Sequence, residues 1–180
     1  MNIQYQTNKL INSGQTTNQQ TDEIINHLGK KPEDTTPKNL VSDMEVYSYL
    51  INEKKLDRNK SLGILANIHG ESNWGESDFW IDAEEQGDTQ EGIGLFQFTF
   101  WSRKAGLLKN VPDYKTNWKG QVDYFLQEPE AKGYLEQNFE TANKAAEYLM
   151  NENIRPDPEH RPGRTEKHNK YLENFIKNLK

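Results

Sequence analysis

The segment Asn67–Trp74 reads NIHGESNW, and the later segment Gly92–Phe98 reads GIGLFQF. The first places an acidic residue, Glu71, at the end of a helical apolar pattern. The second is rich in glycine and aromatic residues, and we expect it to form the other wall of a cleft. A carboxyl that is half-buried beside aromatic side chains keeps its proton to higher pH, as a general acid near neutral pH requires. This chemistry suits the cleavage of a glycosidic bond.

The helix that leads to Glu71 is predicted from its apolar spacing and its start signal. Asp57 is expected to cap this helix. Ile64, Ile68 and Glu71 have the spacing i, i+4, i+7, which places them on one inward-facing stripe. The alternative is an ordinary helix-end glutamate that faces solvent, which is the commoner situation for this residue type.

Apolar periodicity predicts a mainly helical domain. Further helices are expected after Ser42 or Asp43, around Lys104–Leu108, over Trp118–Leu126, after Thr141 and from about Arg164. The first of these should bury Met44, Tyr47, Leu50 and Ile51. Ser77–Gly92 predicts a loop or a small irregular hairpin, Ile93–Phe98 a strand or a helix start, and Ile154–Gly163 a proline-broken loop. The fold class is therefore α+β, predominantly helical, with at most a small β-hairpin or sheet.

Composition limits the domain organisation and the classes of partner. The chain has 180 residues, of which 33% are hydrophobic, and the polar residues concentrate in 1–40. We expect residues 1–40 to form an arm and linker, and 41–180 to form one domain. The net charge of −6 argues against non-specific binding to nucleic acid or to an anionic membrane.

Cysteine count and apolar runs exclude other classes. The sequence has no cysteine, which excludes disulfide scaffolds and thiolate metal sites. No apolar run reaches the roughly 18 to 20 residues of a membrane span. The first residues lack the basic and apolar regions of a secretory signal, so we expect another route of delivery.

Other candidate site residues lie in the two walls and between them. Those expected to bind substrate are Ser72, Trp74, Gly94, Gln97, Phe98 and Trp101. Glycine allows close approach of the backbone, and aromatic rings stack on sugars, although a turn and core packing explain the same residues. Asp82, Asp88 and Glu91 are candidates for a second carboxylate, or else belong to a solvated acidic loop.

Neither a metal nor a cofactor is expected. The acidic stretch that begins at Asp82 faintly resembles a calcium loop, but its twelfth position is Ile93 instead of a bidentate glutamate. The four histidines do not have the spacing of metal ligands.

The run Ala66–Trp74, followed by Gly92–Phe98, resembles the phage tail lysozyme family of the lysozyme-like superfamily. Further segments match in order: Arg103–Leu108, Gln121–Leu126, Ala145–Leu149 to Arg155-Pro156, and Arg164–Phe175. The resemblance covers about residues 43–176 and leaves 1–42 outside it. The acidic stretch 77–91 matches nothing in the family pattern.

The resemblance implies a lysozyme-like fold that cleaves the β-1,4 bond between N-acetylmuramic acid and N-acetylglucosamine in peptidoglycan. It makes Glu71 the catalytic acid and base, as in similar enzymes where one glutamate does most of the work. Ser72 and Gln97 are then expected to orient groups in the cleft. Trp74, Phe98 and Trp101 would line it.

The same resemblance implies a phage particle as the setting. The protein is expected to be made in the host cytoplasm, carried in the virion and used on the cell wall during entry. Residues 1–40 would dock on a phage structural protein of the tail, baseplate or capsid interior. Three alternatives stay open: a lytic transglycosylase with 1,6-anhydro products, a non-catalytic structural protein of tail or capsid, and a late-acting endolysin.

Overall fold

The computed structural model describes residues 39–74, 77–84, 92–99, 101–156 and 158–179. The helices are α3 (Asp43–Asn52), α4 (Arg58–Ser72), α5 (Trp101–Asn110), α6 (Trp118–Gln127), α7 (Pro129–Glu136), α8 (Ala142–Leu149) and α9 (Arg161–Asn178). The strands are β1 (Leu40–Ser42), β2 (Asn73–Trp74) and β3 (Asp78–Trp80). A π-helical turn (Met150–Ile154) and a 3-10 turn (Pro158–His160) lie between α8 and α9. The predicted α+β class, predominantly helical with a small sheet and a lysozyme-like fold, is confirmed.

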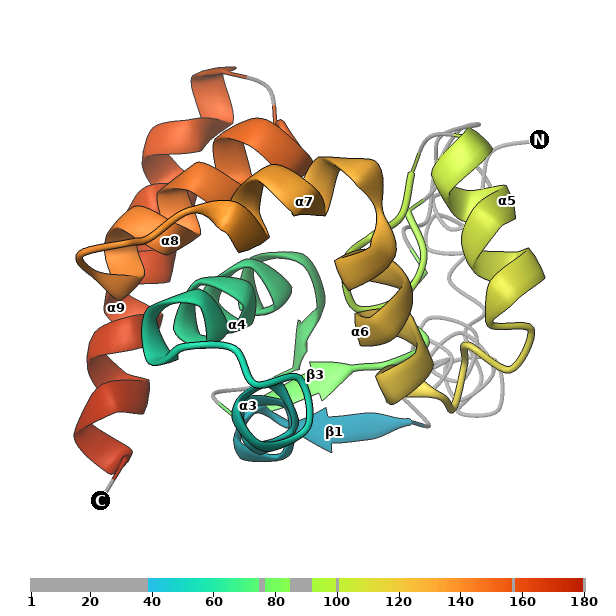
Figure 1. The fold of residues 1–180 in the computed structure, drawn as a ribbon, viewed down its shortest axis with the longest axis horizontal. Coiled ribbons are helices and arrows are strands. Elements are labelled where there is room, and N and C mark those ends of the chain that lie inside the picture. The colour runs from blue at the N-terminus through green and yellow to red at the C-terminus, as the bar shows by residue number, and fades with distance from the viewer. Residues whose placement is uncertain (1–38, 75–76, 85–91, 100, 157, 180) are drawn as a thin grey trace, which may run out of the picture. The chain divides into compact units, whose positions relative to one another are not determined.

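Helix α4 is the central element of the domain and packs against α3, α8, α9 and β3 (Figure 1). It begins where predicted, because the Asp57 carboxylate accepts a hydrogen bond from the Lys60 amide at 2.9 Å. Every residue from Ser61 to Ile68 is buried. At Gly63 a Cβ would lie 2.7 Å from the Cβ of Ala145. The missing side chain therefore lets α4 and α8 approach closely.

The small sheet starts directly at the end of α4. β3 is its central strand and pairs antiparallel with both β1 and β2. Phe79 of β3 pairs with Val41 of β1 on one side and with Asn73 of β2 on the other. The sheet therefore fixes the direction in which the chain leaves the helix that carries Glu71.

The helix after Ser42 has the predicted cap but a different buried face. Ser42 and Glu45 form a capping box, in which each side chain bonds the other residue's backbone amide. Val46 and Leu50 are fully buried, whereas Met44, predicted to face the core, is 41% exposed. The prediction for Met44 was wrong because α3 presents the stripe through Val46 and Leu50 to the core.

Two helix boundaries differ from the prediction because of prolines. α7 was not among the predicted helices; its eight residues begin at Pro129, which occupies the first turn. α9 begins at Arg161 instead of about Arg164, so Pro162 lies inside its first turn. Proline is tolerated in a first turn because an amide there has no helical partner to lose. The predicted loop over Ile154–Gly163 is correspondingly shorter.

The segment Gly92–Phe98 is neither of the two predicted elements. It forms a turn closed by isolated bridges from Ile93 to Glu84 and to Phe98. Gly94 has φ +74°, and a Cβ there would lie 2.3 Å from the Gln121 side-chain oxygen. That same oxygen accepts the Leu95 amide at 2.7 Å. Glycine is therefore required at this position for the turn to rest on α6.

Candidate active site

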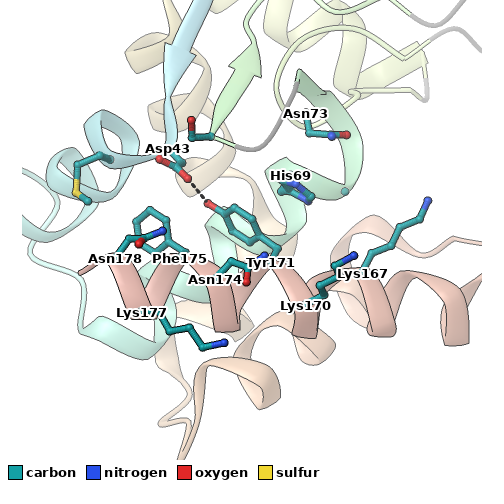
Figure 2. Close-up of a pocket in the computed structure, with 13 residues that line it drawn as sticks. Asp43, His69, Asn73, Lys167, Lys170, Tyr171, Asn174, Phe175, Lys177 and Asn178 are labelled. Carbon is teal, nitrogen blue, oxygen red and sulfur yellow. Dashed lines mark hydrogen bonds between the residues drawn. The ribbon is translucent and has the colours of Figure 1, made fainter. Parts of the chain in front are cut away.

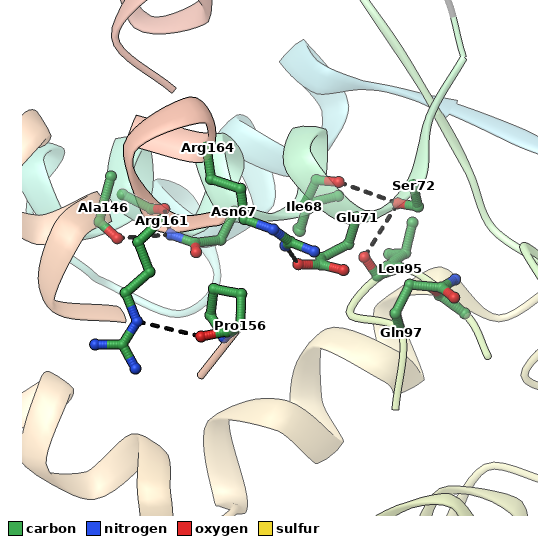
Figure 3. Close-up of polar contacts among 12 residues, drawn as sticks. Asn67, Ile68, Glu71, Ser72, Leu95, Gln97, Ala146, Pro156, Arg161 and Arg164 are labelled. Carbon is green, nitrogen blue, oxygen red and sulfur yellow. Dashed lines mark hydrogen bonds and ion pairs between the residues drawn. The ribbon is translucent and has the colours of Figure 1, made fainter. Parts of the chain in front are cut away.

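Two hollows open beside the C-terminal end of α4. One, of about 810 Å³, lies between the end of α4, the start of α3 and one face of α9 (Figure 2). The other, of about 480 Å³, contains Glu71 and is called the cleft here (Figure 3). The cleft is walled by the end of α4, by β3 and the residues after it, by the 92–99 segment, and by the chain leading into α9.

Glu71 lies in the last turn of α4, at the end of a buried stripe. Ile64 and Ile68, which precede it on that stripe, are fully buried. The Glu71 side chain itself is only 10% exposed and faces the cleft. The helical spacing of this stripe therefore places the Glu71 carboxylate at the point where the buried face of α4 reaches the wall of the cleft.

Arg164, from the first turns of α9, forms an ion pair with Glu71 (Figure 3). Its side chain is 30% exposed and lines the same cleft. Burial lowers the pKa of Arg164 from its usual value, but an arginine remains cationic at neutral pH. A cation in this position favours the charged form of the carboxylate. Glu71 must therefore gain a proton against this partner before it can act as an acid.

Ser72 joins the two walls of the cleft. Its single hydroxyl proton is shared between the carbonyl oxygens of Ile68, at an oxygen–oxygen distance of 3.2 Å, and Leu95, at 3.0 Å (Figure 3). The residue is buried, with 4% of its surface exposed. The geometry thus commits this hydroxyl to holding the 92–98 turn against the end of α4.

Gln97 lies on the opposite wall and lines the cleft. Its backbone is left-handed, with φ +44°. Its side-chain amide donates to the carbonyl oxygens of Gly94 at 3.0 Å and Ala83 at 3.4 Å. These bonds leave the Gln97 side-chain oxygen as the group with free capacity for a ligand. Gly94 itself is buried behind Gln97 and is not among the residues that line the cleft.

The three aromatic candidates occupy different environments. Phe98 is fully buried and makes an edge contact with Tyr124 at a ring-centroid distance of 5.4 Å. Trp101 begins α5 and is 88% exposed. Trp74 belongs to β2, and its side chain lies outside the described part of the chain. In the cleft, the described large aromatic residue is Trp80 of β3.

The candidate second carboxylates are not gathered at Glu71 in the described structure. Asp82 accepts hydrogen bonds from the Asn39 amide at 3.1 Å and the Trp80 indole at 2.6 Å. Asp88 and Glu91 lie outside the described residues. Their roles stay predictions.

Glu84 is a carboxylate that the structure does place in the cleft. It pairs with Lys115 at 2.8 Å and accepts the Tyr114 hydroxyl at 3.0 Å. The hydrogen bond from Lys115 lowers the pKa of Glu84, so this carboxyl is charged at neutral pH. Such a group can accept a proton or a sugar hydroxyl but cannot donate a proton.

Arg164 and Lys115 were missed as site residues by the sequence reasoning. Arg164 appeared there only as the start of a helix. Its ion pair with Glu71 spans 93 positions in the chain. No local spacing records such a contact, so only the packing of α9 against α4 reveals it.

Within the described residues, no three His, Cys, Asp or Glu side chains gather as a metal site would require. Among the helices that the structure describes, none is both long and apolar enough to span a membrane.

A mainly helical domain with a small sheet beside its central helix is lysozyme-like in fold. The chain belongs to the phage tail lysozyme family, whose model matches residues 42–175. The family supports a lysozyme-like protein that acts on peptidoglycan, in the context of a phage tail. The expected resemblance over about residues 43–176 is thereby confirmed. A search of curated proteins finds no match.

Proposed function

We propose that this protein is a virion-associated muramidase, which cleaves the β-1,4 bond between N-acetylmuramic acid and N-acetylglucosamine. The observation that carries the proposal is Glu71, a nearly buried carboxylate at the wall of a cleft in a domain of the phage tail lysozyme family. Glu71 protonates the leaving glycosidic oxygen and then removes a proton from the attacking water.

Other residues of the cleft support this chemistry. Arg164 holds the Glu71 carboxylate in position between turnovers. Glu84, charged through Lys115, can accept hydrogen bonds from sugar hydroxyls on the opposite side of the cleft. The Gln97 side-chain oxygen can accept from an acetamido N–H. Trp80 offers an apolar face for a sugar ring.

Replacement of Glu71 by glutamine tests the proposal directly. The Glu71→Gln variant keeps the shape of the side chain and removes the titrating proton. Because a positioned general acid contributes about a hundred- to ten-thousand-fold, hydrolysis of purified peptidoglycan should fall by at least a hundredfold. Glu147→Gln, at an exposed position of α8, is the matched control and should retain the wild-type rate. Wild-type activity in Glu71→Gln would show that Glu71 is not the catalytic acid and base.

Product analysis decides the type of cleavage. Hydrolysis leaves reducing muramic acid ends, whereas a lytic transglycosylase leaves 1,6-anhydro ends because the 6-hydroxyl replaces water. Mass spectrometry of the soluble fragments separates these two outcomes. Binding without any released fragment would instead favour a non-catalytic tail protein.

We also propose that the polar N-terminal segment docks the enzyme on a phage structural protein. The deletion that tests this proposal ends before Asn39, because β1 begins at Leu40 and the Asn39 carbonyl accepts the Ile81 amide at 3.0 Å. Removal of residues 2–38 should therefore leave hydrolysis intact and abolish incorporation into particles. Incorporation at the wild-type level, measured by immunoblot of purified particles, would contradict the docking role.

A further inference from the structure

The floor of the larger hollow beside α4 is formed by side chains that contact one another. His69 stacks on Tyr171 at a ring-centroid distance of 4.2 Å, and the Tyr171 hydroxyl donates to Asp43 at 3.2 Å (Figure 2). Phe175 continues this floor along α9. The hollow has a volume of about 810 Å³, larger than the cleft. It is therefore large enough to hold several residues of an extended chain.

The rim of this hollow is basic in an acidic protein. Lys167, Lys170 and Lys177 of α9 line this rim. We call the whole hollow the lysine groove. All three are exposed, and none of them forms an ion pair with another described residue. The whole chain, by contrast, carries a net charge of −6. A local excess of unpaired cations against that background favours an anionic ligand.

The floor does not neutralise these cations. The acidic residue that lines the groove among the described residues is Asp43, which is buried and bonded to Tyr171. Burial raises the pKa of Asp43, and its hydrogen bond to Tyr171 keeps this carboxylate in the floor, away from the exposed lysines. Burial lowers the pKa of His69, with a smaller contribution from Lys167, so this ring adds no charge at neutral pH. The three lysines therefore make the electrostatic potential of the groove positive.

The groove and the cleft meet at the end of α4. Gly70 and Asn73 line both hollows, on either side of Glu71 and Ser72. A ligand whose sugar lies at Glu71 can therefore send a branch past Asn73 into the lysine groove. Asn174 and Asn178, one turn apart on α9, present amides there that can bond a peptide backbone.

We propose that the lysine groove binds the carboxylates of the stem peptide that branches from N-acetylmuramic acid. This inference rests on the proposed function, because the glycan must lie at Glu71 for its peptide to reach the groove. The lysines pair with the free carboxylates of the stem, and the asparagines bond its backbone. The protein then prefers glycan that carries stems over bare glycan.

The test compares two substrates made from the same glycan strands, one with stems and one stripped of them by an amidase. The variant Lys167→Gln/Lys170→Gln/Lys177→Gln removes the basic rim. Its kcat/KM should fall on the order of tenfold on the stem-bearing strands, since each partly screened charge pair is worth at most a few-fold. It should stay within about twofold of wild type on stripped strands. Equal loss on both substrates, or no loss on either, would overturn the inference.

A second triple variant controls for the change in net charge. Lys109, Lys132 and Lys144 are exposed and lie on α5, α7 and α8, away from the groove. Lys109→Gln/Lys132→Gln/Lys144→Gln should hydrolyse both substrates like the wild type. If it loses the same activity on stem-bearing strands, the effect is one of overall charge and the groove has no special role.

A binding measurement separates the failure of this inference from that of the proposed function. In the Glu71→Gln background, calorimetry compares a disaccharide–tetrapeptide with the bare disaccharide. Tighter binding of the peptide form that disappears with the three groove lysines supports the groove, even if the wild type cleaves nothing. Equal affinities for the two probes would refute it while leaving the Glu71 experiment untouched. Stronger binding of a poly(glycerol phosphate) probe at the same lysines would also overturn it, by assigning the groove to wall phosphates.

Discussion

At the scale of single residues, the site depends on what surrounds Glu71. Behind it, Ile68 fixes the orientation of the helix, and beside it Ser72 ties the helix end to Leu95. In front of it, Arg164 offers a cation that stabilises the carboxylate. The acid that the proposed reaction needs is the protonated form. Arg164 therefore sets the pH range over which Glu71 can donate a proton.

Arg164→Gln should move the pH dependence of hydrolysis. Without the cation, Glu71 keeps its proton to higher pH, so the high-pH limb of the kcat/KM profile should shift upward by about one pH unit. Arg164→Lys retains the charge and should leave that limb in place. The measurement is kcat/KM on soluble glycan from pH 4 to 9. A uniform loss of rate at every pH, with the limb unmoved in Arg164→Gln, would show a structural role alone.

At the scale of elements, α6 supports the wall opposite Glu71. The Gln121 amide donates to the carbonyl oxygens of Ile81 at 2.8 Å and Tyr114 at 2.7 Å, while its oxygen holds Leu95. At the other end of α6, Glu128 receives both a 2.7 Å and a 2.6 Å hydrogen bond from Arg103 of α5. This bidentate pair is almost fully buried, so it fixes α5 against the junction of α6 and α7.

Arg103→Met should destabilise the domain by about 3 to 5 kcal/mol, because it leaves the Glu128 carboxylate buried without its partner. The free energy of unfolding from urea denaturation measures the loss. Lys132→Met breaks an exposed pair with Glu136 and should cost about 0.5 kcal/mol or less. Similar losses in the two variants would show that burial of the Arg103–Glu128 pair adds nothing.

At the scale of the whole domain, the packing of α9 on α4 buries His168. His168 is 2% exposed, and neither of its ring nitrogens has a hydrogen-bond partner among the described residues. Gly70 makes room for it, since a Cβ there would lie 2.8 Å from His168 Nε2. Burial, with smaller contributions from Arg164 and His69, lowers the pKa of His168 to about 4. The folded domain thus excludes a proton that the unfolded chain accepts.

This linkage predicts loss of stability in mild acid. A histidine whose pKa is about 6.5 unfolded and about 4 folded contributes stability above pH 6.5 that disappears as the pH falls toward 4. Between pH 7 and pH 5 the free energy of unfolding should fall by about 2 kcal/mol from His168 alone. His69, whose pKa is also lowered by burial, adds to the fall.

Urea denaturation at the two pH values measures this effect. His168→Gln should remove most of the difference between pH 7 and pH 5, whatever its effect on stability at pH 7. His160→Gln replaces an exposed histidine and should leave the difference unchanged. An unchanged difference in His168→Gln would exclude this residue as the source of the acid sensitivity.

The features that follow from local patterns were predictable from the chain. Asp57 and Thr141 cap helices as predicted, because a side-chain oxygen at that position satisfies an amide only a few residues away. The buried stripe of α4 follows from the 3.6-residue period. The predictions that were wrong concern Met44, where tertiary packing chooses another helix face, and Pro162, which lies in the first turn of α9 instead of a loop.

The amino-acid sequence alone was therefore enough to predict the mainly helical class, the segments that match the family, and Glu71 at the end of an apolar stripe. These features could be predicted because apolar periodicity and helix caps depend on residues within one or two helical turns. It could not specify the partners that Glu71 meets. Arg164 and the lysines of the groove belong to α9, and the 92–98 turn is held by Gln121 of α6. Such contacts arise only when distant elements pack together, since a helix pattern encodes which face is buried but not which other face it meets.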